Sequence, residues 1–455
     1  MKIERQIPKN QPAEARIKNF DEVNKGFTKK QALIESGRCL NCKNAPCKAG
    51  CPVNVDIPAF INLIKKDDVN GALNCIMQTN GLPAVCGRVC PQETQCEERC
   101  VRAKTGGAVA IGALERFAAD NGGGSVPRQI KIDKTAKKVA VIGSGPASLT
   151  CAGDLAKAGI KVTVFEAFHK CGGVLVYGIP EFRLPKKLVQ KEIDYLIKKL
   201  SVKFETNVVI GKTITIDQLK KEYDGIFIGT GAGLPMFMNI KGENLNGVYS
   251  ANEYLTRVNL MNAYKEDSIT PVQKGKNVVV VGAGNVAMDA ARTAVRLGAE
   301  NVSVVYRRGR DEMPARQEEI QHAEEEGVKL CLLTNPVEIS GENGRVKAIK
   351  CVKTRLTEPD ASGRRKSAAV DGTEFIIDCD TVIMAIGTSP NPILREESNV
   401  KTKENGTIIV NGEMQTSDES IYAGGDAVTG AATVILAMGS GKIAAKALIK
   451  RLLKN

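Results

Sequence analysis

The spacing of the cysteines is the strongest chemical signal in this chain of 455 residues. Two runs, CLNCKNAPCKAGCP (39–52) and CGRVCPQETQCEERC (86–100), each place four thiols within one short segment. Gaps of two to five residues let one loop wrap a compact inorganic core, and a following proline turns the chain away from the sulfurs. Zinc is the rival interpretation, but zinc sites usually pair two short hooks that lie far apart. We therefore expect two iron–sulfur clusters.

A dinucleotide-binding turn is predicted in KKVAVIGSGPASLTCAGDLAKAGIKVTVFEA (137–167). A strand over 139–142 leads through Gly143-x-Gly145 into a helix that starts near Pro146 and Ala147. A second strand then ends in Glu166. Glycines at these positions allow a tight turn and let a pyrophosphate approach the helix N-terminus, and an acid about 20 residues later can bind ribose hydroxyls. Ser148 stands where a third glycine is usual, which is expected to loosen helix–strand packing slightly.

A second turn of the same kind is predicted in KNVVVVGAGNVAMDAARTAVRLGAENVSVVYRRGRDEMPAR (276–316). The phosphate-binding stretch comprises Gly282, Gly284, Asn285, Val286 and Ala287. After the following strand the ribose acid is missing, and Arg307 and Arg308 stand in its place. Paired guanidinium groups attract a 2′-phosphate that an acid would repel, so this unit is expected to prefer NADP(H). Arg316 is a further candidate phosphate contact, with a solvated helix start as the alternative.

The C-terminal segment IYAGGDAVTGAATVILAMGSGKIAAKAL (421–448) adds features of a flavin site. A strand meets Gly425 and Asp426, and a helix is expected to open near Thr433. The aspartate can accept hydrogen bonds from ribitol hydroxyls, and the helix N-terminus directs positive potential at the flavin ring. Two nucleotide units beside iron–sulfur ligands predict FAD between a nicotinamide and the clusters.

Composition excludes several classes of protein. Hydrophobic residues make up 43% and charged residues 25% of the chain, as in a globular protein with a full core. No apolar run approaches the ~20 residues of a membrane helix, and the start MKIERQIPKNQ lacks an apolar signal region, so we expect a cytoplasmic protein without a membrane. The net charge is +13, but the absence of Trp and the 4% of aromatic residues argue against nucleic-acid binding.

The order of the predicted elements indicates an α/β protein in which two Rossmann-like nucleotide-binding domains follow an α-helical domain with two iron–sulfur clusters. Segment 56–80 has helical periodicity, with Cys75 as a packing residue. NGGGSVPRQ (121–129) is a predicted linker. The expected domains are helical and iron–sulfur (1–135), FAD-binding, first part (136–247), NADP(H)-binding (248–374) and FAD-binding, second part (375–455).

On these motifs the chain resembles the glutamate synthase small-subunit family and its relatives, which include the large subunit of NADH-dependent ferredoxin:NADP+ oxidoreductase. The resemblance covers essentially the whole sequence. It is most specific in GGVLVYGIPEFRLPK (172–186), whereas GENLNGVYSANEYLTRVNLMNAY (242–264) and RRGRDEMPARQEEI (307–320) are similar to the ferredoxin:NADP+ oxidoreductase branch. The family implies FAD, two 4Fe–4S clusters and a nicotinamide site.

The resemblance also implies roles for individual residues. Gly173 and Arg183 would lie at the FAD, with Arg183 at the flavin ring as a catalytic residue. Cys86 would bind no cluster, and Cys171 is interpreted as a packing residue. One cluster would be held by Cys39, Cys42, Cys47 and Cys100, and the other by Cys51, Cys90, Cys96 and Glu115.

The expected reaction is hydride exchange between NADP(H) and the flavin, with single electrons leaving through the clusters to a second protein subunit. Two partners stay open. One is a small subunit carrying flavin and a 2Fe–2S cluster, with ferredoxin as a further acceptor and bifurcation undecided. The other is the large subunit of glutamate synthase. A flavin disulfide reductase is disfavoured because neither nucleotide unit holds a CxxC or CxxxxC pair, and a non-catalytic cluster scaffold because both nucleotide motifs are intact. We expect a hetero- or homo-oligomer.

Overall fold

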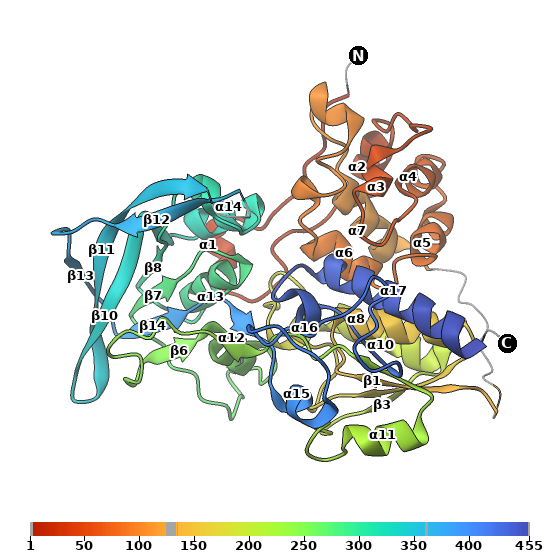
Figure 1. The fold of residues 1–455 in the computed structure, drawn as a ribbon. Helices are drawn as coiled ribbons and strands as arrows, with labels where there is room; N and C mark the ends of the chain where they lie inside the picture. Colours follow the sequence, from red (N-terminus) through yellow and green to blue (C-terminus); the bar gives the residue numbers. More distant parts are fainter. Residues whose placement is uncertain (1–2, 124–132, 134, 360–362, 454–455) are drawn as a thin grey trace.

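The computed structural model describes residues 3–123, 133, 135–359 and 363–453. Figure 1 shows a helical lobe formed by the N-terminal residues and two α/β units below and beside it. Most of the predicted linker, residues 124–129, lies outside the described residues. Within the described residues, no helix is long and apolar enough to cross a membrane.

The N-terminal lobe consists of short helices joined by the cysteine loops. The periodic segment 56–80 forms two helices rather than one, because the chain turns at Asp67, which has a φ of +63°. Asp56 and Asp68 cap these helices through their side-chain oxygens. The helices are α1 (Ala13–Arg16), α2 (Lys29–Ser36), α3 (Pro46–Ala49), α4 (Ile57–Lys65), α5 (Val69–Met77), α6 (Pro83–Val89) and α7 (Ile111–Asn121), with 3₁₀ turns η1 (Gln92–Thr94) and η2 (Val101–Lys104).

The first α/β unit is built on a parallel sheet with the strand order β16-β4-β1-β2-β3. The last strand of the chain therefore pairs beside strands that come nearly 200 residues earlier. The strands are β1 (Lys138–Ile142), β2 (Lys161–Phe165), β3 (Lys203–Glu205), β4 (Gly225–Ile228) and β16 (Ile421–Ala423). The helices are α8 (Pro146–Lys157), α9 (Val174–Tyr177), α10 (Lys186–Leu200), α11 (Ile216–Glu222), α15 (Ile393–Ser398), α16 (Asp426–Thr429) and α17 (Val434–Leu453).

The second α/β unit repeats this arrangement with the order β6-β14-β7-β8-β9, so β14-β7-β8-β9 corresponds to β4-β1-β2-β3. Its parallel strands are β6 (Val248–Ser250), β7 (Asn277–Val281), β8 (Asn301–Val305), β9 (Lys329–Cys331) and β14 (Thr381–Met384). Its helices are α12 (Ala251–Asn259), α13 (Asn285–Arg296) and α14 (Gln317–Glu325), with the 3₁₀ turn η3 (Arg310–Glu312).

An antiparallel layer lies on the side of the second unit that faces away from the helical lobe (Figure 1). It contains β10 (Thr334–Glu342), β11 (Arg345–Pro359), β12 (Arg365–Ala369) and β13 (Phe375–Asp378), and a separate pair, β5 (Leu234–Pro235) with β15 (Thr388–Ser389), joins the two units. Strands β13 and β14 pair with β11 and β7, so the second unit continues to residue 384, beyond the boundary expected at 374/375. The chain returns to the first sheet after β15.

Burial of both faces of the first sheet explains why its strands are continuous runs of apolar residues. In β1, Val139 and Val141 face one core cluster while Ala140 and Ile142 face another, so both faces of the sheet are covered. The first of these clusters also contains Phe60 of the helical lobe. The helical lobe and the first α/β unit therefore share one hydrophobic core, and this shared core sets the position of the cysteine loops against the nucleotide fold.

Candidate functional site

The predicted turn between β1 and α8 has the geometry of a phosphate cradle. Gly143 has a φ of +87°, and a Cβ there would lie 2.7 Å from the Gly229 carbonyl oxygen. A Cβ on Gly145, the N-cap of α8, would meet nothing within 4 Å, so the space before the helix is open to a ligand. Pro146 and Ala147 begin the helix. This open helix N-terminus fits the pyrophosphate of a dinucleotide.

Ser148 does not loosen the helix packing. Its hydroxyl is fully buried and donates to the Gly229 carbonyl at 3.3 Å. The side chain therefore joins α8 to the end of β4, where the usual third glycine gives only close packing.

Glu166 is held in place at the end of β2 by backbone donors. The carboxylate accepts from the Ser144 amide at 3.0 Å and from the Phe168 amide at 2.8 Å. The Ser144 hydroxyl also donates to Glu166 and accepts from the Gly172 amide at 2.8 Å. Next to Gly172, Gly173 has a φ of +54° and crosses Gly145 so closely that a Cβ would lie 2.8 Å from its Cα.

The C-terminal loop brings Asp426 to the same region. Burial raises the pKa of Asp426 to about 6, and its carboxylate accepts from the Ala432 amide at 3.3 Å. Burial also raises the pKa of Tyr177 to about 12, with the nearby charges of Asp426 and Glu166 adding to the shift. Tyr177 thus lies near both predicted ribose and ribitol acceptors. The donor and acceptor set of the three loops fits an extended dinucleotide such as FAD.

The last of these loops ends at helix α17. Gly425 adopts a φ of +66°, which only glycine takes without strain. The Thr433 hydroxyl accepts from the Leu436 amide at 3.3 Å and so caps the start of α17 at Val434. The N-terminus of this 20-residue helix is thereby fixed beside Asp426, as the sequence predicts.

The second phosphate turn has the same form between β7 and α13. Gly282 has a φ of +126°, and a Cβ there would lie 2.3 Å from the Ala385 carbonyl oxygen. Gly284 is the N-cap of α13, Asn285 is its first residue, and the Val286 side chain is exposed. These residues leave the start of α13 accessible to the phosphates of a nicotinamide dinucleotide.

The two arginines after β8 differ in exposure. Arg307 is exposed, and its backbone is anchored because its carbonyl accepts from the Thr354 hydroxyl at 2.7 Å. Arg308 is buried, with 8% of its surface accessible. Arg307 is therefore the better placed of the two to bind a 2′-phosphate, and the role of both stays a prediction.

Arg316 contacts the cysteine loop as well as the nucleotide turn. Its amide donates to the Asn285 side chain at 3.0 Å. Its guanidinium donates to the Arg88 carbonyl at 3.1 Å, to Gln92 at 3.2 Å and to Glu93 at 3.3 Å, and these three residues lie between or beside Cys86, Cys90 and Cys96. The phosphate contact predicted for Arg316 remains a prediction, and no local sequence pattern indicated the contact with the cysteine loop.

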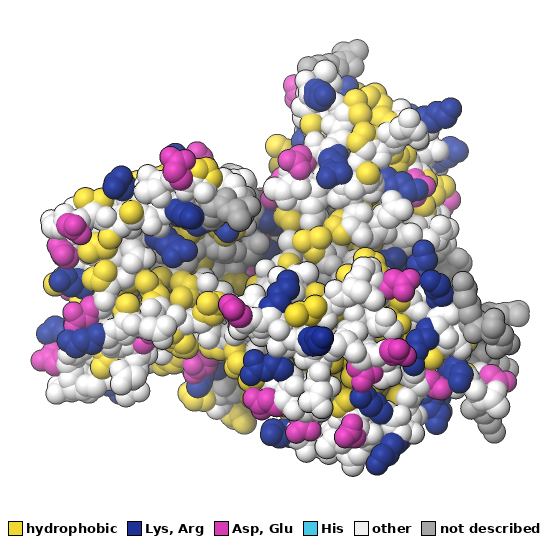
Figure 2. Space-filling model, in the orientation of Figure 1, with side chains coloured by type: hydrophobic (Ala, Val, Ile, Leu, Met, Phe, Trp, Pro, Cys, Tyr) yellow, Lys and Arg dark blue, Asp and Glu magenta, His cyan; other side chains and the backbone are white. Residues whose placement is uncertain are grey.

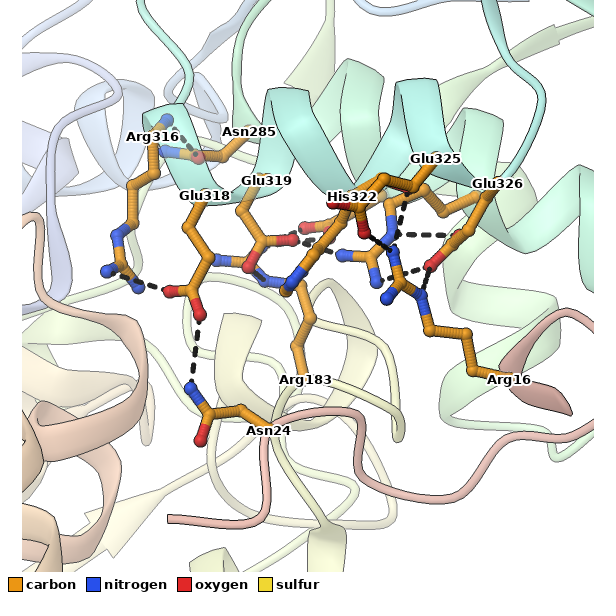
Figure 3. A network of polar contacts seen from close by, with 12 residues as sticks. Arg16, Asn24, Arg183, Asn285, Arg316, Glu318, Glu319, His322, Glu325 and Glu326 are labelled. Carbon is orange, nitrogen blue, oxygen red and sulfur yellow. Dashed lines mark hydrogen bonds and ion pairs between the residues drawn. The ribbon is translucent and has the colours of Figure 1, made fainter. Parts of the chain in front are cut away.

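Arg183 lies in a buried ion network between the two α/β units (Figure 3). Its guanidinium pairs with Asp289 of α13 at 2.7 Å and with Glu319 of α14 at 3.1 Å. Burial alone lowers the pKa of Arg183, but the two carboxylates outweigh burial and raise it. The position at the flavin ring implied by the family stays a prediction, since these pairs account for the side chain without it.

The network continues along α13 and α14. Arg292 pairs with Glu319 and Glu326, Arg296 pairs with Glu326 at 2.6 Å, and Arg16 of the N-terminal arm pairs with Glu326 at 2.7 Å. Figure 3 shows Glu319, Glu326 and Arg16 of this network beneath α14. Sequence reasoning missed Asp289, Glu319 and Glu326, because charged residues on amphipathic helices ordinarily face solvent.

The predicted cluster ligands fall into two groups, and the first group surrounds Cys39 and Cys100. Burial raises the pKa of Cys39, and the nearby thiols of Cys100 and Cys42 raise it further. Burial likewise raises the pKa of Cys47 to about 11, with Cys100 and Cys39 adding to the shift. These effects indicate that the thiols of Cys42, Cys47 and Cys100 lie near Cys39. We call Cys39, Cys42, Cys47 and Cys100 the first thiol set.

The second group surrounds Glu115 on α7. Burial raises the pKa of Cys51 to about 11, and the charges of Glu115 and Cys90 raise it further. Burial is also the main cause of the raised pKa of Cys96, to which Glu115, Cys90 and Cys51 contribute together with Glu97. We call Cys51, Cys90, Cys96 and Glu115 the second ligand set. A hydrogen bond with Cys90, together with burial, raises the pKa of the Cys86 thiol, so Cys86 lies beside this set as well. The membership of both sets is taken from the family resemblance, and their ligand role stays a prediction.

Both an iron–sulfur core and zinc are candidates for these donor sets. Across residues 3–123, 133, 135–359 and 363–453, no three His, Cys, Asp or Glu side chains converge closely enough to hold a single metal ion. Zinc draws four donors onto one atom at about 2 Å, whereas a cluster holds its thiolates farther apart around a larger core. Which of the two centres these residues hold is not decided by their side-chain geometry.

Cys86 is buried beside the second ligand set. Its thiol donates to the Asn80 side-chain oxygen at 3.7 Å and contacts the Met438 sulfur at 3.5 Å. Cys75 is half-buried and its thiol lies 3.9 Å from the Asp56 carbonyl oxygen. Burial raises the pKa of Cys171 to about 11, which favours the neutral thiol of a packing residue. All fourteen cysteines are free of disulfides.

Comparison with known proteins shows which family combines a nucleotide-binding fold with an iron–sulfur domain. A family model described as pyridine nucleotide-disulphide oxidoreductase matches residues 137–441, and one described as dihydropyrimidine dehydrogenase domain II, 4Fe-4S cluster, matches residues 16–124. The glutamate synthase (NADPH) small chain of Halomonas elongata is 38% identical over 98% of this chain and 96% of its own length. The chain belongs to the glutamate synthase (NADPH) small-chain family.

Two further similarities extend this result. The NADP(+)-dependent formate dehydrogenase subunit beta of Moorella thermoacetica is 39% identical over 88% of this chain and 59% of its own length. The structure of Mycobacterium tuberculosis FprA in complex with NADPH matches 70% of this chain and 85% of its own, with a TM-score of 0.59 and 20% identity, which shows the fold. The predicted fold class, two Rossmann-like units after an iron–sulfur domain, is thereby confirmed.

Membership also establishes the class of activity. This member of the glutamate synthase small-chain family is an NADPH-dependent oxidoreductase with FAD and iron–sulfur cofactors. Relatives named as a small chain and as a subunit beta are parts of larger assemblies, which supports a partner subunit. A disulfide-reducing activity is not implied, because the α/β part of the sequence contains no CxxC or CxxxxC pair.

Proposed function

We propose that this chain takes a hydride from NADPH at its second α/β unit and delivers single electrons to a partner protein through two 4Fe–4S clusters. FAD, when bound, supplies the chemistry that accepts electrons in a pair and releases them one at a time. The chain itself has to hold the nicotinamide, the flavin and the clusters at short distances and to exclude water between them. No acid–base pair is required.

One contact carries this proposal. Helix α17 begins at the predicted flavin site and packs four to five residues later against Pro52 and Cys86, which are neighbours of the second ligand set. A Cβ on Gly439 would lie 3.1 Å from the carbonyl oxygen of Pro52, which follows Cys51, and the neighbouring Met438 contacts Cys86. With a rise of 1.5 Å per residue, Met438 is about 6 Å along the helix from Val434. This spacing supports electron transfer from the flavin to the second ligand set.

The first thiol set then provides the exit. Leu40, between two of its cysteines, is 56% exposed, and Val101, which follows Cys100, is 44% exposed. The exposed side chains of Lys43, Arg99 and Lys104 lie in the same loops. Figure 2 shows hydrophobic side chains next to lysine and arginine side chains on the upper lobe. Apolar surface beside positive charge favours docking of an acidic electron-transfer protein.

A small ferredoxin-like acceptor and a glutamate synthase large subunit remain the two candidate partners. The basic surface and the motifs of 242–264 and 307–320 favour the ferredoxin-like acceptor. Electron bifurcation would use the same arrangement of cofactors. The 38% sequence identity to a glutamate synthase small chain favours the large subunit of glutamate synthase as the partner. The free state of all fourteen cysteines supports a reducing compartment such as the cytoplasm for either partner.

The experiment is anaerobic stopped-flow reduction of the purified chain by NADPH, followed by the absorbance of flavin and clusters. We expect rapid bleaching of the flavin and then of the clusters. Gly439→Leu should leave the first phase unchanged and slow the second at least tenfold, because the new side chain displaces Pro52; Gly439→Ala is the milder matched control. Absence of flavin bleaching would refute the proposal, as would conversion of glutamine and 2-oxoglutarate to glutamate by this chain alone.

A further inference from the structure

Asn80, between α5 and α6, is a buried polar residue with no role in the scheme above. Its side chain is completely inaccessible to solvent. The oxygen accepts from the Leu82 amide at 2.9 Å and from the Cys86 thiol at 3.7 Å. The nitrogen donates to one carboxylate oxygen of Glu115 at 2.7 Å. Both ends of the amide are therefore fixed, and its orientation follows from its partners.

Glu115 needs such a donor because its carboxylate is buried. The hydrogen bond from Asn80 satisfies one of its two oxygens, Oε1. The same amide accepts from the thiol of Cys86, four residues before Cys90, so Asn80 connects Glu115 with the second cysteine run. A carboxylate held through one oxygen has the other oxygen available to a metal.

We propose that Asn80 is a positioning residue that orients Glu115 as the oxygen ligand of the second cluster. The inference rests on the proposed ligand role of Glu115. By holding Oε1, the amide fixes the rotation of the carboxyl group and directs Oε2 toward the three thiols of the set. Groups that hydrogen-bond a ligand of this kind orient it and tune the metal centre. The same side chain engages the Cys86 thiol, which keeps that sulfur turned toward Asn80 and Met438.

Asn80→Asp is the sharpest variant. Aspartate keeps the size of the side chain and the oxygen that accepts from Leu82, but it has no N–H to donate to Glu115. We expect the iron content of the purified holoprotein to fall from about eight toward about four atoms per FAD, or the electron paramagnetic resonance (EPR) signal of the second cluster to change shape. The signal of the first cluster and the FAD content should not change. Asn121→Asp is the matched control, because Asn121 donates to the Phe117 carbonyl on α7 away from the ligands.

A second background separates positioning from a structural role. In Glu115→Cys the fourth ligand is a thiolate, which does not need the amide. Adding Asn80→Asp should therefore leave the EPR signal and iron content of Glu115→Cys unchanged. If Asn80 merely supported the fold, Asn80→Asp would lower the iron content equally in the otherwise unaltered protein and in Glu115→Cys.

The outcomes distinguish this inference from the proposed function. If Asn80→Asp has the iron content and EPR signal of the unaltered protein, the positioning role is overturned. Joint loss of flavin and both clusters would also overturn it, because Asn80 would then determine the fold. If Glu115→Ala leaves the second cluster intact, the ligand assignment itself fails.

Discussion

Replacing Glu319 by glutamine should loosen the junction between the two α/β units. Glu319 pairs with Arg183 from the first unit and with Arg292 from α13, and its side chain is 6% exposed. Glutamine has nearly the same shape but no charge, so both buried guanidinium groups lose part of their compensation. Breaking one side of a buried ion pair typically costs about 3–5 kcal/mol.

The pKa of Glu319 gives a similar magnitude. Burial alone would raise it, but Arg183 and Arg292 outweigh burial and lower it from 4.5 to about 2. A difference of about 2.5 pKa units corresponds to roughly 3 kcal/mol. Because the folded-state pKa is lowered, this stabilisation is fully present above about pH 4.5 and is lost as the pH falls toward 2.

Hydrogen–deuterium exchange at neutral pH measures the effect directly. A loss of about 3 kcal/mol should raise the exchange of α13 and α14 about a hundredfold. Glu318→Gln is the matched control on the same helix, because Glu318 is 33% exposed and its pair with Arg316 is expected to contribute at most about 1 kcal/mol. Equal protection of these helices in Glu319→Gln and in the unaltered protein would refute the reasoning, as would an equally large effect of Glu318→Gln.

Three further perturbations test the sites. Gly143→Ala should abolish FAD binding, measured as flavin per protein, because a Cβ would lie 2.7 Å from a backbone oxygen at a φ of +87°; flavin at full occupancy would contradict the cradle. Replacing Arg307 and Arg308 with Ala should raise the KM for NADPH at least tenfold more than that for NADH; equal changes would exclude a 2′-phosphate contact. Burial raises the pKa of Glu192, on α10, to about 8 in the folded protein. The unfolded chain loses this proton at about pH 4.5, so folding stability falls as the pH rises from about 4.5 to 8. Glu192→Gln should remove this fall in thermal unfolding scans, and an unchanged pH profile would argue against a buried neutral acid.

Local sequence patterns were sufficient for the parts of the site that depend on backbone geometry. The turns at Gly143 and Gly282 require a positive φ, and the chain around them must be a strand followed by a helix, so a few residues predict each cradle. The end of the second unit was harder to place. Strand 381–384 is a buried apolar run like those of the first unit, and only its pairing with β7 assigns it to the second sheet.

The types of cofactor thus follow from the sequence, because glycine turns and cysteine loops act over a few neighbouring residues. What tertiary structure alone decides is which distant groups meet. Asn80 reaches Glu115 across 35 residues, Arg183 reaches Asp289 across 106, and Arg316 reaches Gln92 across 224. Each is an ordinary polar residue in its own segment, and its role arises only when burial removes water and leaves groups of distant segments as its hydrogen-bonding partners.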